Sequence, residues 1–412
     1  MKALYLTIIL LLFQYTQAQT PGCTDPLSNN YNPQATVNDG SCTYSPSSVS
    51  PLSSVNLPAA VVETSGLIKW DERLLTHNDN GDINLYSLDT ITGAVVQTFP
   101  VTGTSNKDWE EISQDEQYIY IGDFGNNSNG NRNNLRIIRV GKEELLSGNL
   151  QAMSIYFSYT NQVNFTPTGG NNTDFDCEAF IVSQDSIYLF TKQWVSKKTA
   201  LYALPKTPGT HIAQWKGELN VGGLITGATY LEDKRLVVLT GYSTLLQPFL
   251  YLLYDFNGTD FFGGNKRKLS TNGMGFHQLE GIATSNGLDY FVSNEKFVQA
   301  PIVNVSQKLH KISLAPYLQN YLENRSLSTI QNDIRSRIRV YPNPVGDILY
   351  IEIEPGLIGI QYTLYDMNGR NAQSGVLNSE MNRLDISRLQ GGVYVIKVSE
   401  FPDYSYRLVK KG

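Results

Sequence analysis

Charged residues and the usual catalytic residue types are scarce in this sequence. Charged residues make up 17% of its 412 positions, the formal net charge is −6, and there are only 4 His. Since Lys and Arg form no stripe, the chain has no cationic field for a phosphate backbone, which argues against nucleic acid as a partner. The chain also lacks a Gly-x-Ser-x-Gly elbow, a His-Glu-x-x-His pair, a phosphate loop and a dinucleotide motif. The sequence therefore predicts none of the enzyme classes that those motifs mark.

Long hydrophobic runs are also missing, except at the N-terminus. Met1-Lys2 supplies one positive charge, an apolar core runs from Leu4 to Phe13, and Ala18 is a small residue at the end of the segment. This pattern is typical of a signal peptide, and the core is too short to span a bilayer stably. We predict a signal peptide over residues 1–18, cleavage after Ala18, and no transmembrane segment in the mature chain.

Cysteine occurs only 3 times. In an exported chain this number predicts one disulfide and one remaining thiol. Cys23 and Cys42 are the natural pair, because they flank a Pro-, Asn-, Asp- and Gly-rich segment too small for a core of its own. Closing such a loop is worth roughly 3 kcal/mol. Cys177 lies within an expected strand, which favours a small buried side chain over a nucleophile.

Strand-forming residues, by contrast, are abundant. The chain has 25 Tyr and 16 Phe, and 34 Gly supply turns, so we expect an almost all-β protein. One unit recurs: the acidic entry and strand Asp108–Ile112, followed by a second strand over Tyr118–Asn126, with weaker copies that begin at Asp176 and Gln278. A strand-rich unit that recurs every roughly 45 to 65 residues is typical of a propeller.

The fold class that follows is all-β, with a five-bladed β-propeller and then a small C-terminal antiparallel β-sandwich. The fifth unit lacks a fourth strand, which Ser54–Pro58 can supply to close the ring and remove an exposed sheet edge. In the fourth unit, Ile225 and Gly227 align with Asp108 and Glu110. The predicted boundaries are 1–18 for the signal peptide, 19–44 for a disulfide module, 45–53 for a flexible linker, 54–315 for the propeller, 316–337 for a hinge with a short helix, and 338–412 for the C-terminal domain.

The disulfide module, Gly22–Tyr44, resembles the short thrombospondin type 3-like modules of bacterial surface proteins. In that family, Asp and Asn oxygens near a Gly turn hold calcium, and the resemblance implies Asp25, Asn38 and Asp39 as the ligands here. Three donors are fewer than the six to eight oxygens that calcium prefers. A turn held by the disulfide without a metal is therefore an equally open interpretation.

The C-terminal domain shows several separated motifs, at Val340–Ile351, Tyr362–Arg370, Leu389–Val398 and Arg407–Gly412. They resemble the type A C-terminal sorting domain of type IX secretion. The resemblance implies recognition by an outer-membrane translocon and sorting machinery, and a protein that is secreted or held at the outer-membrane surface. Alternating apolar and polar positions with Gly-Gly and Asn-Gly turns independently favour a β-sandwich.

Acidic side chains recur where the first strand of each unit begins and where the second strand ends. In a propeller both points lie at one mouth of the central channel, so these side chains should converge. Carboxylates that converge repel one another unless they are protonated, paired or bound to a cation, which makes Ca²⁺ a candidate cofactor. The candidate metal ligands are Glu110, Glu178, Glu280, Asp123, Asn78 and Asn294. The alternative is that these side chains cap strand ends, pair with Lys192 or His77, and form hydrogen bonds with neighbouring loops.

A weaker catalytic candidate is His77, which can act as a general base if Asp79 orients it. The alternative is a capping or solvated His. Two functions stay open, and the sequence does not decide whether the protein is an enzyme. One is a binding module for a surface glycan or protein. The other is a calcium-dependent hydrolase of esters or lactones that uses the acidic face, as in the gluconolactonase-like propellers that this architecture resembles.

Overall fold

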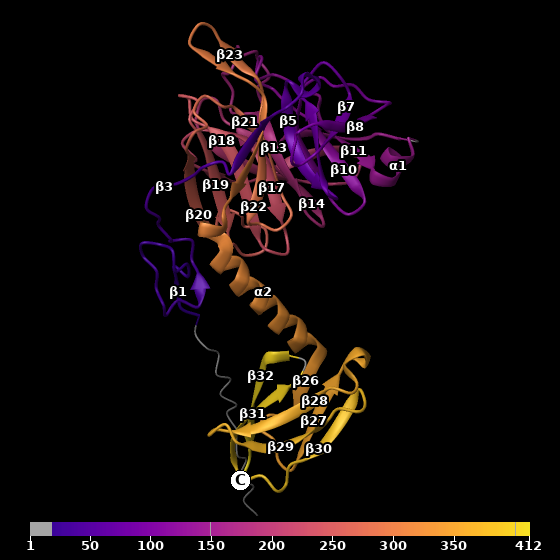
Figure 1. Ribbon diagram of the computed structural model, residues 1–412, viewed down its shortest axis with the longest axis vertical. Helices are drawn as coiled ribbons and strands as arrows, with labels where there is room; N and C mark the ends of the chain where they lie inside the picture. The colour runs from indigo at the N-terminus through magenta and orange to yellow at the C-terminus, as the bar shows by residue number, and fades with distance from the viewer. Residues whose placement is uncertain (1–18, 149, 400) are drawn as a thin grey trace, which may run out of the picture. The chain divides into compact units, whose positions relative to one another are not determined.

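The computed structural model describes residues 19–148, 150–399 and 401–412 (Figure 1). The predicted signal peptide lies outside these residues. The chain divides into two compact units, residues 1–319 and 320–412. No helix in the described part of the chain is both long enough and apolar enough to cross a membrane.

The first unit contains five sets of four strands. Their bounds are β5 (Thr64–Trp70), β6 (Arg73–Asn78), β7 (Asn84–Leu88) and β8 (Val95–Pro100); β9 (Trp109–Gln114), β10 (Tyr118–Asp123), β11 (Leu135–Gly141) and β12 (Met153–Tyr159); β13 (Asp176–Val182), β14 (Ser186–Lys192), β15 (Thr199–Pro205) and β16 (Gly209–Leu219); β17 (Leu224–Leu231), β18 (Leu236–Tyr242), β19 (Pro248–Tyr254) and β20 (Asn265–Thr271); and β21 (Leu279–Thr284), β22 (Asp289–Asn294), β25 (Lys308–Ser313) and β4 (Ser53–Asn56). Within each set, neighbouring strands pair antiparallel, and β12 also pairs parallel with β16.

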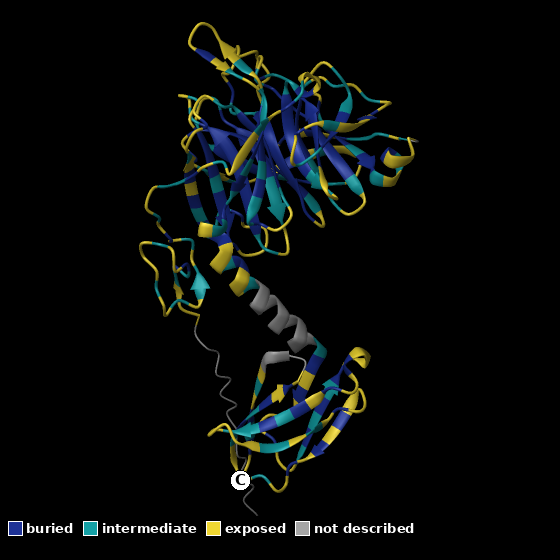
Figure 2. Cartoon of the chain, viewed as in Figure 1, coloured by how far each residue is buried: buried dark blue, intermediate teal, exposed yellow. Residues whose placement is uncertain are grey.

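The first strand of each set packs against the first strands of the next and the previous set. Strand β5 contacts β9, β9 contacts β13, β13 contacts β17, β17 contacts β21, and β21 contacts β5, so the five strands form a ring. The body is therefore propeller-like, with β5, β9, β13, β17 and β21 innermost. Buried residues colour these inner strands dark blue in Figure 2, and β13 is buried along its whole length. Three small elements interrupt this pattern. The 3-10 turn η1 (Ala59–Val61) lies between β4 and β5, the helix α1 (Lys142–Ser147) lies between β11 and β12, and the hairpin of β23 (Phe297–Gln299) and β24 (Val303–Val305) lies between β22 and β25.

The prediction of a closing strand from the N-terminal side is confirmed. Strand β4 pairs antiparallel with β25, so that residues from before the first set complete the fifth. The hydroxyl of Ser54 lies 2.7 Å from Nδ1 of His310, whose Nε2 lies 2.9 Å from Oδ1 of Asn294 on β22. These contacts join the closing strand β4 to its neighbour β25 and, through His310, to β22, the next strand of the sheet.

The N-terminal module and the segment after it differ partly from expectation. Two short strands, β1 (Pro21–Gly22) and β2 (Val37–Asn38), pair parallel within the module. The expected flexible spacer contains β3 (Ser47–Val49), which pairs parallel with β20 of the fourth set. The spacer prediction was wrong there because the backbone of Ser47–Val49 satisfies the free edge of β20.

The region that we expected to be a hinge with a short helix is one helix, α2 (Ala315–Arg337). Pro316 lies in its first turn, where proline is tolerated, and no Gly or further Pro interrupts the segment. Leu318 and Leu322 are buried near its start. The polar composition that suggested a hinge therefore belongs to a continuous helix.

The second unit consists of two small antiparallel sheets. One is formed by β26 (Ile338–Tyr341), β27 (Ile348–Ile353) and β30 (Met381–Asp385), and the other by β28 (Gln361–Asp366), β29 (Asn371–Val376), β31 (Gly392–Val398) and β32 (Phe401–Lys410). The 3-10 turn η2 (Pro355–Leu357) connects β27 to β28. A single buried cluster, which includes Leu349 and Ile351 from the first sheet and Leu364 and Ile396 from the second, fills the space between them. The apolar positions alternate along β27 and β31, as the sequence pattern predicted.

Candidate functional site

Each innermost strand has an irregular register near its start. The pairing with the second strand shifts between Thr64 and Leu67, Trp109 and Glu111, Cys177 and Ala179, Ile225 and Gly227, and Leu279 and Ile282. A bulge adds one residue to a strand and turns its side chain in a new direction. The residues at the equivalent place in the five strands are Ser65, Glu110, Glu178, Thr226 and Glu280.

This register corrects the alignment of the fourth unit. The residues equivalent to Asp108 and Glu110 are Leu224 and Thr226, one position before the Ile225 and Gly227 that we expected. The hydroxyl of Thr226 donates to the backbone carbonyl of Leu279 on the next inner strand. The fourth unit therefore contributes a structural hydroxyl where three other units contribute a carboxyl group.

A central cavity of about 210 Å³ lies at this level and receives residues from all five sets. Its carboxyl groups are Asp79, Asp108, Glu110, Glu178, Glu280 and Glu295. Its other lining residues are Lys192, Trp194, Tyr242, Gln278, Asn127, Asn171 and Ser65. Glu110, Glu178 and Glu280 thus converge, and Asp79 lines the same cavity.

The carboxyl groups lie close together in a buried place, which favours their protonated forms. Burial, followed by the charge of Glu178, raises the pKa of Glu110 well above its usual value. Burial and the nearby charge of Glu63 raise the pKa of Asp79 to about 8. The pKa of Asp108 is raised to about 6 by burial and by Asp176. A Cβ on Gly125 would contact the carboxyl ends of Glu110 and Asp108, so a side chain at this position would displace both groups.

Lys192 is the only basic residue among the described residues that line the cavity. Its ammonium group forms a buried ion pair with the carboxylate of Glu178, and lies 4.8 Å and 5.1 Å from the ring centroids of Trp194 and Tyr242. Burial alone lowers the pKa of Lys192, but the charge of Glu178 and the other acidic groups outweigh it and raise that pKa well above its usual value. The neighbouring acidic groups thus favour the ammonium form of Lys192.

Glu111 is fully buried and does not line the cavity, and no sequence pattern indicated its role. Oε1 accepts a hydrogen bond from its neighbour Ile112 (2.9 Å) and Oε2 accepts one from the N–H of Ala228 on β17 (2.7 Å). The N–H of Leu67 on β5 is a third backbone donor to this carboxylate. In the other four sets the equivalent residues are Gly66, Ala179, Gly227 and Gly281, which leave the space that Glu111 fills. Only an alignment based on the bulges would have revealed this difference.

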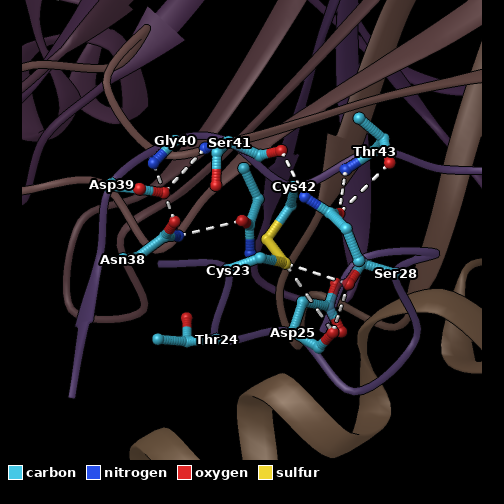
Figure 3. Close-up of a disulfide and its surroundings, with 12 residues drawn as sticks. Cys23, Thr24, Asp25, Ser28, Asn38, Asp39, Gly40, Ser41, Cys42 and Thr43 are labelled. Carbon is cyan, nitrogen blue, oxygen red and sulfur yellow. Dashed lines mark hydrogen bonds between the residues drawn. A yellow bond between two sulfur atoms is a disulfide. The ribbon is translucent and has the colours of Figure 1, made fainter. Parts of the chain in front are cut away.

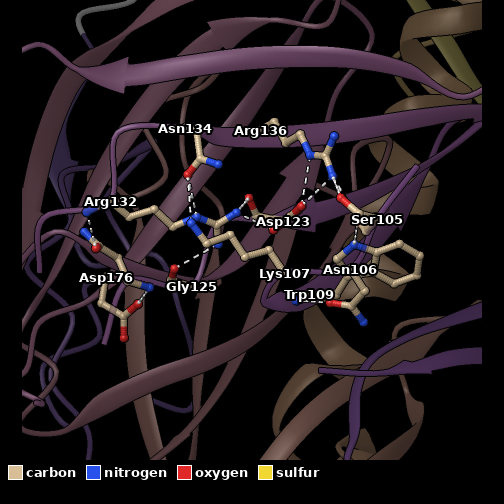
Figure 4. A network of polar contacts seen from close by, with 11 residues as sticks. Ser105, Asn106, Lys107, Trp109, Asp123, Gly125, Arg132, Asn134, Arg136 and Asp176 are labelled. Atoms are coloured by element: carbon tan, nitrogen blue, oxygen red, sulfur yellow. Dashed lines mark hydrogen bonds and ion pairs between the residues drawn. The ribbon is translucent and has the colours of Figure 1, made fainter. Parts of the chain in front are cut away.

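Three further candidate ligands lie elsewhere. Asp123 accepts hydrogen bonds from Arg132 and, at 2.9 Å, from Nε of Arg136, and both are ion pairs (Figure 4). The amide of Asn78 donates to Asp82 at 2.9 Å, and that of Asn294 donates to the carbonyl of Ser306 at 2.9 Å. None of the three lines the central cavity. They match the alternative interpretation, in which such residues tie strand ends to neighbouring loops.

The two catalytic candidates are not in hydrogen-bond contact with each other. His77 is fully buried, its Nδ1 lies 3.0 Å from the carbonyl of Asn78, and its ring packs edge-on against Trp109. Burial lowers the pKa of His77 to about 4. The carboxylate of Asp79 accepts a hydrogen bond from Asn80 instead. The geometry of His77 is that of a packed core histidine.

The residues of the central cavity do not fit a metal ion well. Among residues 19–148, 150–399 and 401–412, no group of three His, Cys, Asp or Glu has a metal-holding arrangement. Lys192 already supplies a positive charge beside Glu178, at the place where a divalent cation would need that carboxylate. A calcium ion would therefore have to compete with a fixed ammonium group.

The N-terminal module has the expected disulfide between Cys23 and Cys42, with the two Cα atoms 4.8 Å apart (Figure 3). Asp25 accepts hydrogen bonds from Tyr44 (2.8 Å) and from Tyr254 on β19 (2.5 Å). Asn38 donates to Asn265 at 2.9 Å. These contacts dock the module on the fourth set of strands.

The third oxygen donor of the module is Asp39, which accepts a hydrogen bond of 3.0 Å from the N–H of Ser41 within its own turn. All three proposed calcium ligands thus have protein partners. Cys177, the remaining thiol, is fully buried, and burial raises its pKa, as expected for a structural side chain.

Comparison with known proteins identifies the C-terminal region. Residues 339–411 match the family model described as a secretion system C-terminal sorting domain. The chain therefore carries a type IX C-terminal sorting domain, which implies engagement of the type IX sorting machinery and secretion to the cell surface or exterior. No curated protein sequence matches the chain significantly.

Several solved structures are similar to the propeller-like body. A PQQ-bound aldose sugar dehydrogenase from Streptomyces coelicolor has 12% identity and a TM-score of 0.38, and the match covers 65% of this chain and 98% of that one. A gluconolactonase from Xanthomonas campestris has 10% identity and a TM-score of 0.36, with 65% and 98% covered. PorZ, a surface component of the type IX secretion system of Porphyromonas gingivalis, has 12% identity and a TM-score of 0.30, with 85% and 45% covered. These similarities are too low to carry an argument about activity.

Proposed function

We propose that this protein is a cargo of type IX secretion whose first unit is a five-bladed propeller that binds a surface glycan or protein through its central cavity. The five sets of four strands, the ring of inner strands and the closing strand β4 support the blade count. The sorting domain at residues 339–411 supports the export route.

The observation that carries the binding function is the polar lining of the central cavity. Six carboxyl groups, three side-chain amides and two aromatic rings converge in about 210 Å³. Carboxylates and amides are acceptors and donors for hydroxyl groups, and the few precisely placed polar groups of a concave site provide specificity.

Binding can be tested with the mature chain, labelled and applied to a glycan array and to whole cells. Binding that is lost when Glu280 is replaced with Gln, and kept when the exposed Glu116 is replaced with Gln, would support the central cavity as the site. Equal binding by the unaltered chain and by both variants would contradict the central cavity as the binding site.

The export route has a separate test. Removal of residues 339–411 should abolish surface display and leave the protein in the periplasm, because the sorting domain is the part that the machinery recognises. Display that survives this deletion would contradict the assignment.

The second candidate function, a calcium-dependent esterase or lactonase, has less support from the same geometry. It needs Glu178 as a free metal ligand, whereas Glu178 is paired with Lys192. A calcium-dependent rise in the melting temperature, together with turnover in an ester and lactone panel that E178Q abolishes, would favour this function instead.

A further inference from the structure

Two buried carboxyl groups that line the central cavity have no hydrogen-bond partner in the described part of the chain. Glu110 and Glu280 are each only 7% exposed and line the cavity. Neither side chain has a hydrogen bond or a close ion pair with any of the described residues. A buried acceptor without a protein donor takes its hydrogen bonds from water or from a ligand that enters the cavity. Such groups are expected where a ligand supplies the missing donors.

Asp108 and Glu295 also line the cavity without a side-chain hydrogen bond to any of the described residues, but they are only half-buried. The other buried acidic groups nearby, Glu178 and Asp176, have partners. Glu178 has the ammonium group of Lys192, and Asp176 accepts hydrogen bonds from Nε1 of Trp194 at 2.7 Å and from the N–H of Asn126 at 2.6 Å. One cation therefore faces six carboxyl groups in the cavity. Burial and the repulsion of neighbouring carboxylates raise the pKa of Glu110 and Glu280, and a cationic ligand would stabilise their ionised forms, whereas an anionic ligand would not.

The cavity already stabilises one ammonium group, which is that of Lys192. This group lies against one carboxylate and between the faces of Trp194 and Tyr242. A carboxylate together with an aromatic face is a favourable environment for an ammonium ion. A second ammonium group would find equivalent acceptors at Glu110 and Glu280.

The size and polarity of the lining distinguish the possible carriers of that group. At about 210 Å³ the cavity is smaller than the roughly 300–1,000 Å³ of sites that enclose a drug-sized ligand, so it suits a single small unit. The amides of Asn127, Asn171 and Gln278 face the same space. These groups match the hydroxyls of a sugar ring, whereas the apolar stem of a lysine side chain would need an apolar wall.

We propose that the central cavity binds an amino sugar, with the carboxylates of Glu110 and Glu280 as acceptors for its free ammonium group. This inference rests on the proposed binding function and names its ligand class. Trp194 is partly exposed, and its ring supplies a face on which the sugar packs.

The experiment is isothermal titration calorimetry of the mature full-length chain at about pH 7. The probes are glucosamine, glucose, N-acetylglucosamine, lysine with an acetylated α-amine, and calcium chloride. Glucosamine should bind at least about tenfold more tightly than glucose or N-acetylglucosamine, because only glucosamine carries the charge. E110Q and E280Q should each weaken glucosamine binding about tenfold, while E116Q on the exposed turn between β9 and β10 should leave it unchanged.

The comparison of sugars on the unaltered chain keeps the proposal testable if a variant does not fold. Equal affinity for glucose and glucosamine would overturn the role of the ammonium group, yet leave a glycan-binding function standing. Tighter binding of the lysine derivative would overturn the sugar assignment in favour of a protein ligand. Binding of calcium alone, or of no probe, would overturn the proposal, and the glycan array separately decides the binding function.

Discussion

The carboxylate of Glu111 on β9 accepts a 2.7 Å hydrogen bond from the backbone N–H of Ala228 on β17, although β9 and β17 belong to different sheets and are not neighbours in the ring of inner strands. The other oxygen of this carboxylate, Oε1, accepts a hydrogen bond from the backbone N–H of Ile112, and the backbone N–H of Leu67 on β5 is a third donor. One side chain therefore joins three of the five inner strands. The space it needs exists because Gly66 stands beside it, where a Cβ would lie 2.5 Å from Oε1 of Glu111.

Replacement of Glu111 with Ala should lower the free energy of unfolding by roughly 3 kcal/mol or more. Each buried N–H that loses its acceptor costs about 1–3 kcal/mol, and the variant also leaves a void. The matched control is its neighbour: E110Q removes a carboxylate that has no protein partner, so stability should be unchanged or slightly higher. Urea denaturation of the two variants measures the difference. Equal destabilisation by both would contradict the structural role of Glu111.

Replacement of Lys192 with Met should destabilise the protein by about 3–5 kcal/mol, because Glu178 would become a buried charge without a partner. The double variant K192M/E178Q should recover much of that loss. Lys198 and Glu218 form a more exposed ion pair, so K198M should cost less than about 1 kcal/mol. A double variant that is no more stable than K192M would show that the pair does not act as a unit.

Stability should fall as the pH rises from about 6.5 to 9. The pKa of Asp79 is raised to about 8 in the folded chain, from an ordinary value of 3.8, so the folded state holds a proton in this range that the unfolded state has already lost. The folded state then binds more protons than the unfolded state, and the free energy of unfolding decreases with pH.

D79N should flatten part of this dependence, and Glu178, whose pKa burial also raises to about 8, should account for another part. His77 and His310 act in the opposite direction below about pH 6.5, because burial lowers their pKa values to about 4 and 3 and the unfolded chain takes up those protons first. Urea denaturation at a series of pH values measures the net dependence. A free energy of unfolding that rises between pH 6.5 and 9 would contradict the assignment.

A chain that begins at residue 58 should have a markedly lower melting temperature than one that begins at residue 45. Both lack the disulfide module, but only the shorter one lacks β3, which pairs with the outer edge of the fourth set, and β4, which completes the fifth. The loss of β4 exposes the edge of β25 and removes the contact between Ser54 and His310. Scanning calorimetry of both chains is the measurement, and equal melting temperatures would show that ring closure contributes little.

Local patterns in the sequence were sufficient for the overall organisation. Alternating apolar residues predicted the strands, the spacing of Cys23 and Cys42 predicted the disulfide, and an unmatched strand at Ser54–Pro58 predicted the closing strand. The C-terminal motifs predicted the sorting domain. Most of these features depend on residues that are close in sequence. The closing strand was inferred because the fifth unit lacks a fourth strand, which is also visible along the chain.

The identity of the site depended on the register of strands that are distant in sequence. Glu110, Glu178 and Glu280 were predicted to converge because they share one repeat position, and they line the same cavity. Asp123 was predicted to join them from the end of the second strand of its set, but it pairs with Arg132 and Arg136, which the repeat does not specify.

The bulges were the decisive feature that no local pattern revealed. A shift of one residue reverses the direction of a strand side chain, so Thr226 replaces Gly227 at the repeat position and Glu111 points toward the axis beside Glu110. Composition and spacing determined that acidic residues gather at one mouth of a propeller-like body. Only the packing of five strands around one axis decided which carboxylate joins the strands, which one holds Lys192, and which two are left for a ligand.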